Sequence, residues 1–335
     1  MKRSAFLFFY SFILLFLLVG CKGTKPTNNT TESAIKGPQF QADSAYAFCA
    51  AQCKFGPRTM NSTAHDDCAA WIKQQFEQYG CTVEMQQATV HGYDGTPLRA
   101  TNIIAHTHHK YQQERDAILI CAHWDSRPWA DNDPDSTNWH KPVMAANDGA
   151  SGVAVMLELA RLIQQHDSLG VDVDFVCFDA EDWGIPQWST AEDNGNTWAL
   201  GAQHWAAEYS KSANKTSYRY GILLDMVGGQ GARFYQERLS LQYAQTIVDK
   251  VWHAAQTAGY SSQFPTEPGG GITDDHVPVN EVAFIPCIDI IAYYPDCQQS
   301  TFGPTWHTVL DDMQHLDRQT LKAVGQTLVQ VLYSE

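Results

Sequence analysis

Two adjacent carboxylates, Glu181 and Asp182, directly follow an apolar run that begins at Val171. Neighbouring carboxylates resist ionising together unless a positive charge is near. Such a pair at the end of a strand therefore suggests a bound cation and a general acid/base. A solvated acidic turn would contain the same two residues, and it is the commoner interpretation of an isolated pair. The stretch 176–184 indicates chemistry only if other polar side chains converge on it.

Further acids and histidines follow apolar runs or lie in glycine-containing loops. These residues are His123, Asp148, Asp225, Asp274 and His307. In an open α/β sheet the carboxyl ends of parallel strands share one edge, so groups remote in sequence meet there. A mixed set of oxygen and nitrogen ligands suits a catalytic Zn²⁺ with three protein ligands and one open position.

Two of the polar groups also have a structural interpretation. Asp148 precedes a helix predicted over 153–165, and an aspartate at that place usually caps the helix N-terminus. The group His106, His108 and His109 is typical of a loop between strands, and we do not expect it to bind a metal. The cap interpretation of Asp148 weakens because a second acid cluster follows at 181–182.

Helices and strands alternate along the part of the chain that must position these residues. Apolar spacing predicts helices over 42–53, 64–79, 153–165, 199–209, 241–258 and 316–333. Apolar or alternating runs predict strands over 82–91, 100–106, 116–122, 171–178, 220–224 and 282–291, the first two forming a hairpin. This order predicts a three-layer α/β fold with a central, mostly parallel, twisted sheet flanked by helices on both faces.

The first residues predict export and lipid attachment. Lys2 and Arg3 precede an apolar run over 5–18, and Leu-Val-Gly-Cys at 18–21 resembles the lipobox of bacterial lipoproteins. An uncleaved transmembrane anchor is the alternative, but the run is shorter than the ~20 residues that span a bilayer.

We therefore expect three segments: a signal peptide over 1–20, a flexible tether over 21–36, and a single catalytic domain over 37–335. The lipid on Cys21 would be the only contact with the membrane. The expected location is the periplasm, and the expected state is a monomer.

Charge and cysteine content limit the partners. The chain has 37 acidic and 22 basic residues and a net charge of −15, which disfavours nucleic acid and offers no basic patch for anionic lipids. If Cys21 is lipidated, eight cysteines remain, and the periplasm permits disulfides without specifying their pairing. Cys49 with Cys53 and Cys68 with Cys81 are possible pairs.

Several motifs resemble the zinc aminopeptidase superfamily in the same order. They are His123-Trp124-Asp125-Ser126, Asn147-Asp148-Gly149-Ala150-Ser151-Gly152, Asp179-Ala180-Glu181-Asp182, Asp225 and Trp306-His307-Thr308. Within the superfamily the chain is most similar to bacterial glutaminyl cyclases, which convert an N-terminal glutamine into pyroglutamate. That preference depends on the run 127–131 (Arg-Pro-Trp-Ala-Asp), the doubled acid Asp274-Asp275, Trp188 and Trp306.

The resemblance implies a zinc-dependent glutaminyl-peptide cyclotransferase that acts on peptides or proteins with N-terminal glutamine and releases ammonia. It implies one zinc per chain, held by Asp148, Asp182 and His307. It also implies Glu181 as general acid/base, Asp225 and Asp274 as an acidic network beside it, and a pocket walled by Trp188, Trp306 and Phe302.

This chemistry places two demands on the site. Glu181 must both take and return a proton, so we expect repulsion from Asp182, Asp225 and Asp274 to raise its pKa. The second zinc ligand is Asp182, where many members of the superfamily have glutamate. The shorter side chain must bring its backbone or the metal nearer.

Two other functions remain open. A two-zinc aminopeptidase of the same superfamily would use His123 and Asp225 for a second zinc, with Asp148 bridging. Against it, Asp274 would pair with Asp225 and occupy the second site. A lipid-anchored binding protein on an inactive hydrolase fold would lack a ligand or the acid/base, yet all four of those residues are present.

Overall fold

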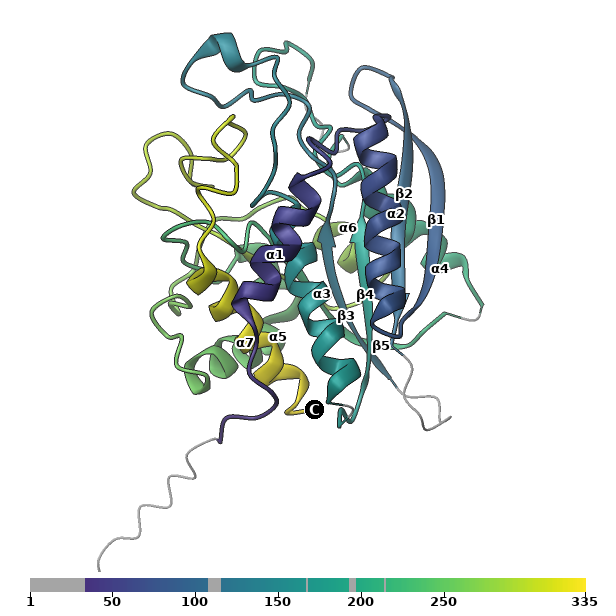
Figure 1. The fold of residues 1–335 in the computed structure, drawn as a ribbon, viewed down its shortest axis with the longest axis vertical. Helices are drawn as coiled ribbons and strands as arrows, with labels where there is room; N and C mark the ends of the chain where they lie inside the picture. Colours follow the sequence, from purple (N-terminus) through teal and green to yellow (C-terminus); the bar gives the residue numbers. More distant parts are fainter. Residues whose placement is uncertain (1–33, 108–115, 167, 193–196, 214) are drawn as a thin grey trace, which may run out of the picture. The chain divides into compact units, whose positions relative to one another are not determined.

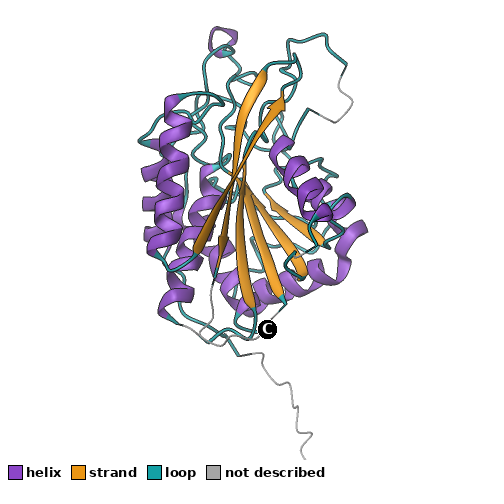
Figure 2. Cartoon of the chain, turned by 90° about the vertical axis from the view of Figure 1, so that its right-hand side faces the viewer, coloured by secondary structure: helices purple, strands orange, loops and turns teal. Residues whose placement is uncertain are grey.

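One mixed, twisted sheet of six strands forms the centre of the computed structural model (Figures 1 and 2). The strands are β1 (Thr82–His91), β2 (Pro97–His106), β3 (Ala117–His123), β4 (Asp172–Phe178), β5 (Tyr218–Asp225) and β6 (Cys287–Ile291). Their order is β1-β2-β4-β3-β5-β6. Strands β3 to β6 run parallel, whereas the β1–β2 hairpin and its pairing with β4 are antiparallel. The structure describes residues 34–107, 116–166, 168–192, 197–213 and 215–335.

The register of the parallel strands brings distant residues to one edge. His123 lies opposite Phe178 on β4, so the acids that follow Phe178 emerge beside it. On the other side of β3, Cys121 lies opposite Leu223 of β5, and Asp225 ends that strand. The carboxyl ends of these parallel strands therefore form one edge, as expected for an open α/β sheet.

Helices cover both faces of the sheet (Figure 2). They are α1 (Ala42–Cys53), α2 (Thr63–Gln78), α3 (Ala150–Gln165), α4 (Leu200–Lys211), α5 (Arg238–Thr257), α6 (His276–Glu281) and α7 (Arg318–Leu332), with a short 3₁₀ helix at Ser136–Asn138. Apolar side chains of α1, α2, α3, α5 and α7 share the larger core, and those of α4 and α6 share a smaller core. The predicted three-layer α/β fold is confirmed.

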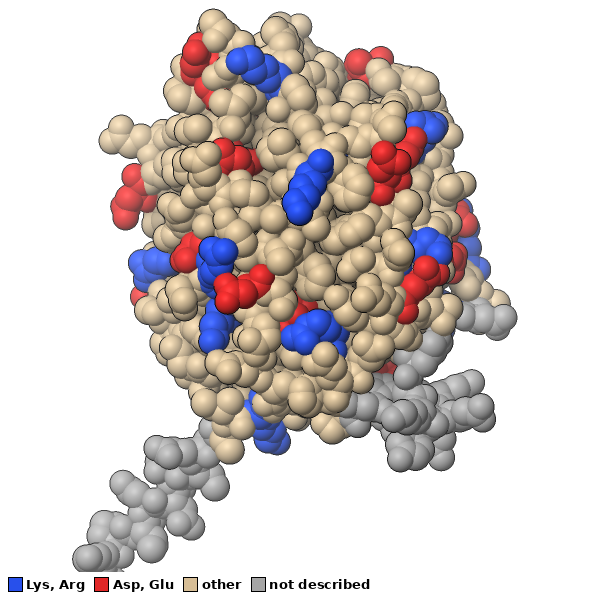
Figure 3. All heavy atoms as spheres, viewed as in Figure 1, with Lys and Arg blue, Asp and Glu red and all other residues tan. Residues whose placement is uncertain are grey.

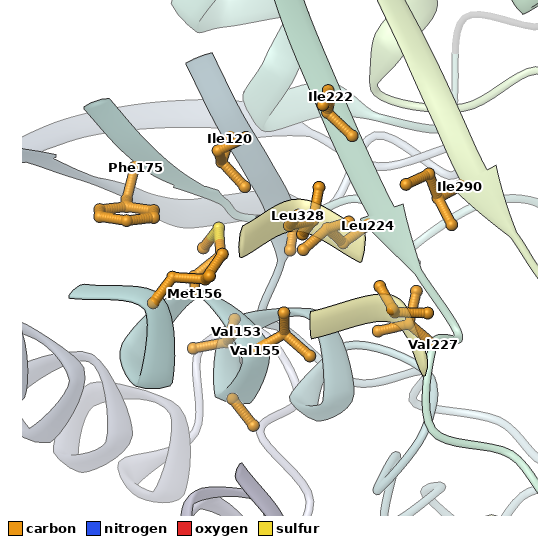
Figure 4. Close-up of a cluster of buried hydrophobic side chains, with 14 of the residues drawn as sticks. Ile120, Val153, Val155, Met156, Phe175, Ile222, Leu224, Val227, Ile290 and Leu328 are labelled. Atoms are coloured by element: carbon orange, nitrogen blue, oxygen red, sulfur yellow. The ribbon is translucent and has the colours of Figure 1, made fainter. Parts of the chain in front are cut away.

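The larger core shows why the central strands are apolar along their whole length. Ile120 and Ile222 from the sheet pack against Val153 and Met156 of α3, with Leu328 of α7 beside them (Figure 4). Successive side chains of a strand point to opposite faces, so the alternate residues of β3 fill the smaller core on the α4 side. Burying one such side chain contributes about 1.5–3 kcal/mol.

Most predicted elements agree with the structure within about three residues at each end, but the predicted strand 282–291 is wrong in its first half. Strand β6 begins only at Cys287, and Phe284 is 80% exposed with a positive φ of 58°. The side chain of Asn280 bonds both the N–H and the carbonyl of Cys287 and closes the turn from α6 to β6. The apolar residues at 282–284 therefore belong to a turn in which Val282 and Phe284 are exposed and Ala283 is buried.

Neither of the two possible disulfides, Cys49 with Cys53 or Cys68 with Cys81, forms in the structure. All eight cysteines in the described part of the chain are free, including Cys49, Cys53, Cys68 and Cys81. Cys49 and Cys68 are fully buried in the larger core, where they pack as small apolar side chains.

The predicted signal peptide and most of the tether lie outside the described residues. Within the described ranges no helix is both long and apolar enough to cross a membrane. Figure 3 shows Lys and Arg side chains dispersed among Asp and Glu on the face drawn, without a continuous basic patch there.

Candidate active site

A cavity of about 470 Å³ opens at the carboxyl edge of the parallel strands. Its lining combines acids, one histidine and aromatic side chains: Asp148, Glu181, Asp182, Asp225, Asp274, His307, Trp198, Phe302 and Trp306, together with Met226, Ile291 and the loop 271–273. All but one of the residues that the resemblance implied therefore line the cavity. The exception is Trp188.

The three expected zinc ligands form a buried group. Nε2 of His307 lies 3.2 Å from Oδ1 of Asp182 and 3.6 Å from Oδ2 of Asp148. One ligand atom from each residue lies within 4.8 Å of the others, and Oδ2 of Asp182 has no hydrogen-bond partner within the described residues. Two carboxylates and an imidazole with an unpaired oxygen at close range fit the ligand set of a catalytic zinc.

Asp148 is positioned by its backbone and does not cap α3. The helix begins at Ala150 after Gly149, whose φ of 103° favours glycine, and no side chain caps it. The N–H groups of Asn147 and Asp148 donate to the carboxylate of Asp311 at 2.8 and 3.0 Å. The cap interpretation is therefore wrong, and the Asp148 side chain faces the cavity.

Two buried carboxylates hold the turn that carries Glu181 and Asp182. Asp125 accepts hydrogen bonds from the N–H groups of Glu181 at 3.1 Å and Asp182 at 3.2 Å. Asp179 accepts from the N–H of Ala180, which has a φ of 53°. Left-handed backbone at Ala180 costs energy, and these bonds hold it in place.

A second group of possible metal ligands lies next to the first. Nε2 of His123 lies 3.0 Å from Oδ1 of Asp148 and 3.3 Å from Oδ1 of Asp225, and all three residues are buried. Asp148 therefore belongs to both groups. The ligands that a second zinc would need are in place.

The acids of the cavity other than Asp148 have raised pKa values. Burial raises the pKa of Glu181 well above its ordinary value, and Asp182 and Asp274 add to the effect against the opposing His123. The expected direction is confirmed, but burial is the main cause rather than repulsion. Burial, together with Asp274, also raises the pKa of Asp225 to about 7.

The aromatic wall differs from the prediction in one residue. Phe302 and Trp306 line the cavity as expected, with ring centroids 4.7 Å apart and planes tilted by 37°. Trp188 instead packs against Trp139, with ring centroids 6.2 Å apart, away from the lining. The tryptophan of the 179–199 segment that lines the cavity is Trp198.

Trp198 is not predictable from the sequence, because no motif contains it. The one feature of the sequence that relates to it is Gly184, because a Cβ at that position would lie 2.0 Å from the Trp198 ring. Arg127 and Asp131 belong to a motif that supports the resemblance, but the sequence did not place them at the site. In the structure both are buried beside the metal ligands. Of the histidine group, His106 pairs with Asp174 at 2.8 Å, and His108 and His109 lie outside the described residues.

Comparisons with known proteins agree with this geometry. The model of peptidase family M28 matches residues 102–332. A solved glutaminyl cyclase from Bacteroides thetaiotaomicron is 45% identical, with a TM-score of 0.85 over 90% of this chain and 100% of that one. A leucine aminopeptidase precursor from the same organism is 44% identical, with a TM-score of 0.84 over the same shares.

Among curated proteins, aminopeptidase YwaD of Bacillus subtilis is 27% identical over 257 residues, which are 75% of this chain. The chain spans about half the length of that relative, 48%. The family model covers more than half of this chain and includes every candidate metal ligand. The chain therefore belongs to peptidase family M28, and its close structural neighbours include bacterial glutaminyl cyclases.

Proposed function

We propose that the protein is a glutaminyl-peptide cyclotransferase that uses one zinc and converts an N-terminal glutamine into pyroglutamate with release of ammonia. The observation that carries the proposal is the position of Glu181, a carboxyl of raised pKa in the aromatic-walled cavity that also contains the Asp148–Asp182–His307 group. The likeness to a glutaminyl cyclase over all of that solved chain supports the same conclusion.

A zinc held by Asp148, Asp182 and His307 would polarise the γ-carboxamide carbonyl and stabilise the oxyanion that develops on it. Glu181 takes a proton from the α-amine as its nitrogen bonds to the carbonyl carbon of the γ-carboxamide, Cδ. The same carboxyl then returns the proton to the departing amide nitrogen, which leaves as ammonia. A raised pKa suits a carboxyl that must do both.

The walls of the cavity bind the glutamine side chain and exclude water. Phe302, Trp306 and Trp198 present apolar rings to a glutamine side chain, and they exclude water from a reaction whose nucleophile is already in the substrate. The rest of the peptide stays outside, so substrates include peptides and proteins with N-terminal glutamine.

A two-zinc aminopeptidase is the second candidate, favoured by the group of His123, Asp148 and Asp225. Mass spectrometry separates the two functions when a peptide beginning with glutamine is incubated with the enzyme, with and without a chelator. Loss of one ammonia, abolished by the chelator and by Glu181→Gln, supports the cyclase. Release of free glutamine with two bound zinc ions per chain refutes it.

We also propose that a lipid on Cys21 anchors a monomeric enzyme to a membrane facing the periplasm. The support is the lipobox at 18–21. Incorporation of a labelled fatty acid, lost in Cys21→Ser together with membrane retention, tests the anchor. Full retention of Cys21→Ser in the membrane fraction contradicts it.

A further inference from the structure

We propose that Arg127 is a positioning residue that holds two of the three zinc ligands, Asp182 and His307, in place for the metal. The inference rests on the proposed metal group and not on the identity of the substrate. It also accounts for a shorter aspartate at the second ligand position.

Arg127 is buried, only 1% exposed, and directs its donors at two carboxylates and a loop backbone. Nε and Nη2 bond the two oxygens of Asp131 at 3.0 and 2.7 Å. Nη1 bonds the backbone carbonyls of Asp182 and Gly184, each at 3.1 Å. One guanidinium therefore fixes the strand-end loop that carries the second ligand.

Arg127 also contacts the side chain of Asp182. Its Nη1 lies 3.4 Å from Oδ1, while Oδ2 is buried without a hydrogen-bond partner in the described part of the chain. One oxygen is thus restrained and the other is left for an ion. The nearby positive charge also reduces repulsion between Asp182 and the neighbouring acids. Because the backbone of Asp182 is fixed close to the cavity in this way, its side chain can reach the metal position without the extra methylene of a glutamate.

The second ligand is reached through Asp131. Its Oδ1 lies 3.3 Å from Nδ1 of His307, and its Oδ2 also accepts from the N–H of Gln187 at 3.0 Å. The two atoms are not placed for a hydrogen bond, but the negative charge of Asp131 beside Nδ1 favours the proton on that nitrogen. Nε2, which faces Asp148 and Asp182, is then free to bind a metal. His307 has a φ of 52°, so its position depends on such outside contacts.

Two tryptophans hold the guanidinium plane. The Arg127 carbon Cζ lies 5.3 Å from the ring centroid of Trp129 and 4.8 Å from that of Trp198. Trp198 in turn stacks on His307, with ring centroids 6.3 Å apart and planes 15° apart. Stacking and a bidentate fork require a planar guanidinium, so lysine would not replace Arg127.

The test measures zinc affinity without substrate, by competition of Zn²⁺ between the protein and a chromophoric chelator. We expect Arg127→Lys and Asp131→Asn each to weaken zinc binding 10- to 100-fold, as loss of such partners does in other zinc sites. Arg99→Lys is the control, since Arg99 pairs with Asp66 on the surface and is 61% exposed. Its zinc affinity should be unchanged.

Cobalt substitution provides a readout that a purely structural role would not move. The visible spectrum of the Co²⁺ protein should shift in Arg127→Lys and Asp131→Asn and stay unchanged in Arg99→Lys. If Arg127→Lys fails to fold, Asp131→Asn carries the test, because it conserves volume and alters only the contacts to Arg127, His307 and Gln187. Zinc affinity within threefold of wild type in a folded variant overturns the inference. Normal zinc binding by wild type without cyclisation refutes the proposed function alone.

Discussion

Asp179 offers a sharp test of how the strand end positions Glu181. The carboxylate is fully buried and is surrounded by three donor groups. Thr101 N–H donates at 2.6 Å, Ala180 N–H at 2.8 Å, and Nε2 of His65 lies 2.9 and 3.0 Å from the two oxygens. Both oxygens are therefore needed as acceptors.

In Asp179→Asn, one oxygen becomes an amide nitrogen. Whichever way the amide turns, the N–H of Thr101 or of Ala180 then faces a donor. A hydrogen bond to a charged group contributes about 1.5–3 kcal/mol, and a buried donor left unpaired costs about 1–3 kcal/mol. We expect the free energy of unfolding to fall by about 3 kcal/mol. We also expect lower activity, because Ala180 carries Glu181 into the cavity.

Urea unfolding of the zinc-free protein, followed by circular dichroism, measures the change. The matched control is Asp116→Asn, since Asp116 is 55% exposed and pairs with Arg219 on the surface at 3.4 Å. That variant should stay within about 0.5 kcal/mol of wild type. If Asp179→Asn unfolds with the same free energy as the control, the reasoning about the buried acceptors is refuted.

Three further predictions concern the cavity and the acids behind it. Glu181→Gln should lower kcat for cyclisation about 10²- to 10⁴-fold with unchanged zinc content, and a smaller loss of kcat would remove it as acid/base. Trp198→Ala should raise KM more than Trp188→Ala does, because only Trp198 lines the cavity, and steady-state kinetics showing the reverse order would contradict the wall assigned here. Burial, with added repulsion from neighbouring acids, raises the pKa of Asp289 well above its ordinary value. The folded state therefore keeps a proton that the unfolded chain loses above about pH 4, and stability falls as pH rises from there through the raised pKa. Asp289→Asn should remove up to about 1.4 kcal/mol per pH unit from that slope, and equal slopes in urea unfolding at several pH values would exclude the effect.

The positions of the strand-end residues were predictable from the sequence because a parallel sheet gathers its carboxyl ends at one edge. His123, Asp182 and Asp225 each end or follow an apolar run, and the register brings them together. The cause of the raised pKa of Glu181 was less accessible, since burial depends on how the loops close over the cavity. The number of acids near Glu181 in the predicted site therefore overstated the contribution of charge repulsion to its raised pKa.

Loop conformation is the part that the sequence did not specify. Trp188 and Trp198 lie in the same segment between β4 and α4, and composition gives no preference for either as the cavity wall. The choice follows from tertiary contacts: Arg127 stacks on Trp198, and Gly184 leaves room for its ring. The turn at 282–284 is a second example, because its apolar residues are typical of a strand and only the hydrogen bonds of Asn280 to Cys287 show that a turn forms there.

The order in which zinc binds to the two candidate ligand groups follows from the residues that surround Asp148. Its Oδ2 faces His307 and its Oδ1 faces His123, so ligand types alone do not distinguish the groups. Each histidine has a carboxylate beside its Nδ1, Asp131 for His307 and Asp125 for His123. The groups differ in the buried arginine beside Asp182 and in Asp274 beside Asp225, which adds to burial in raising the pKa of Asp225 to about 7.

Supporting contacts that fix ligands strengthen metal binding, and a ligand that holds a proton must release it before a cation binds. We therefore expect zinc to fill the Asp148–Asp182–His307 group first. In a zinc titration followed by calorimetry, Asp182→Asn should abolish the tightest binding step, and Asp225→Asn should leave it. Loss of that step in Asp225→Asn alone would assign the tight site to His123 and Asp225, and with it the chemistry of an aminopeptidase.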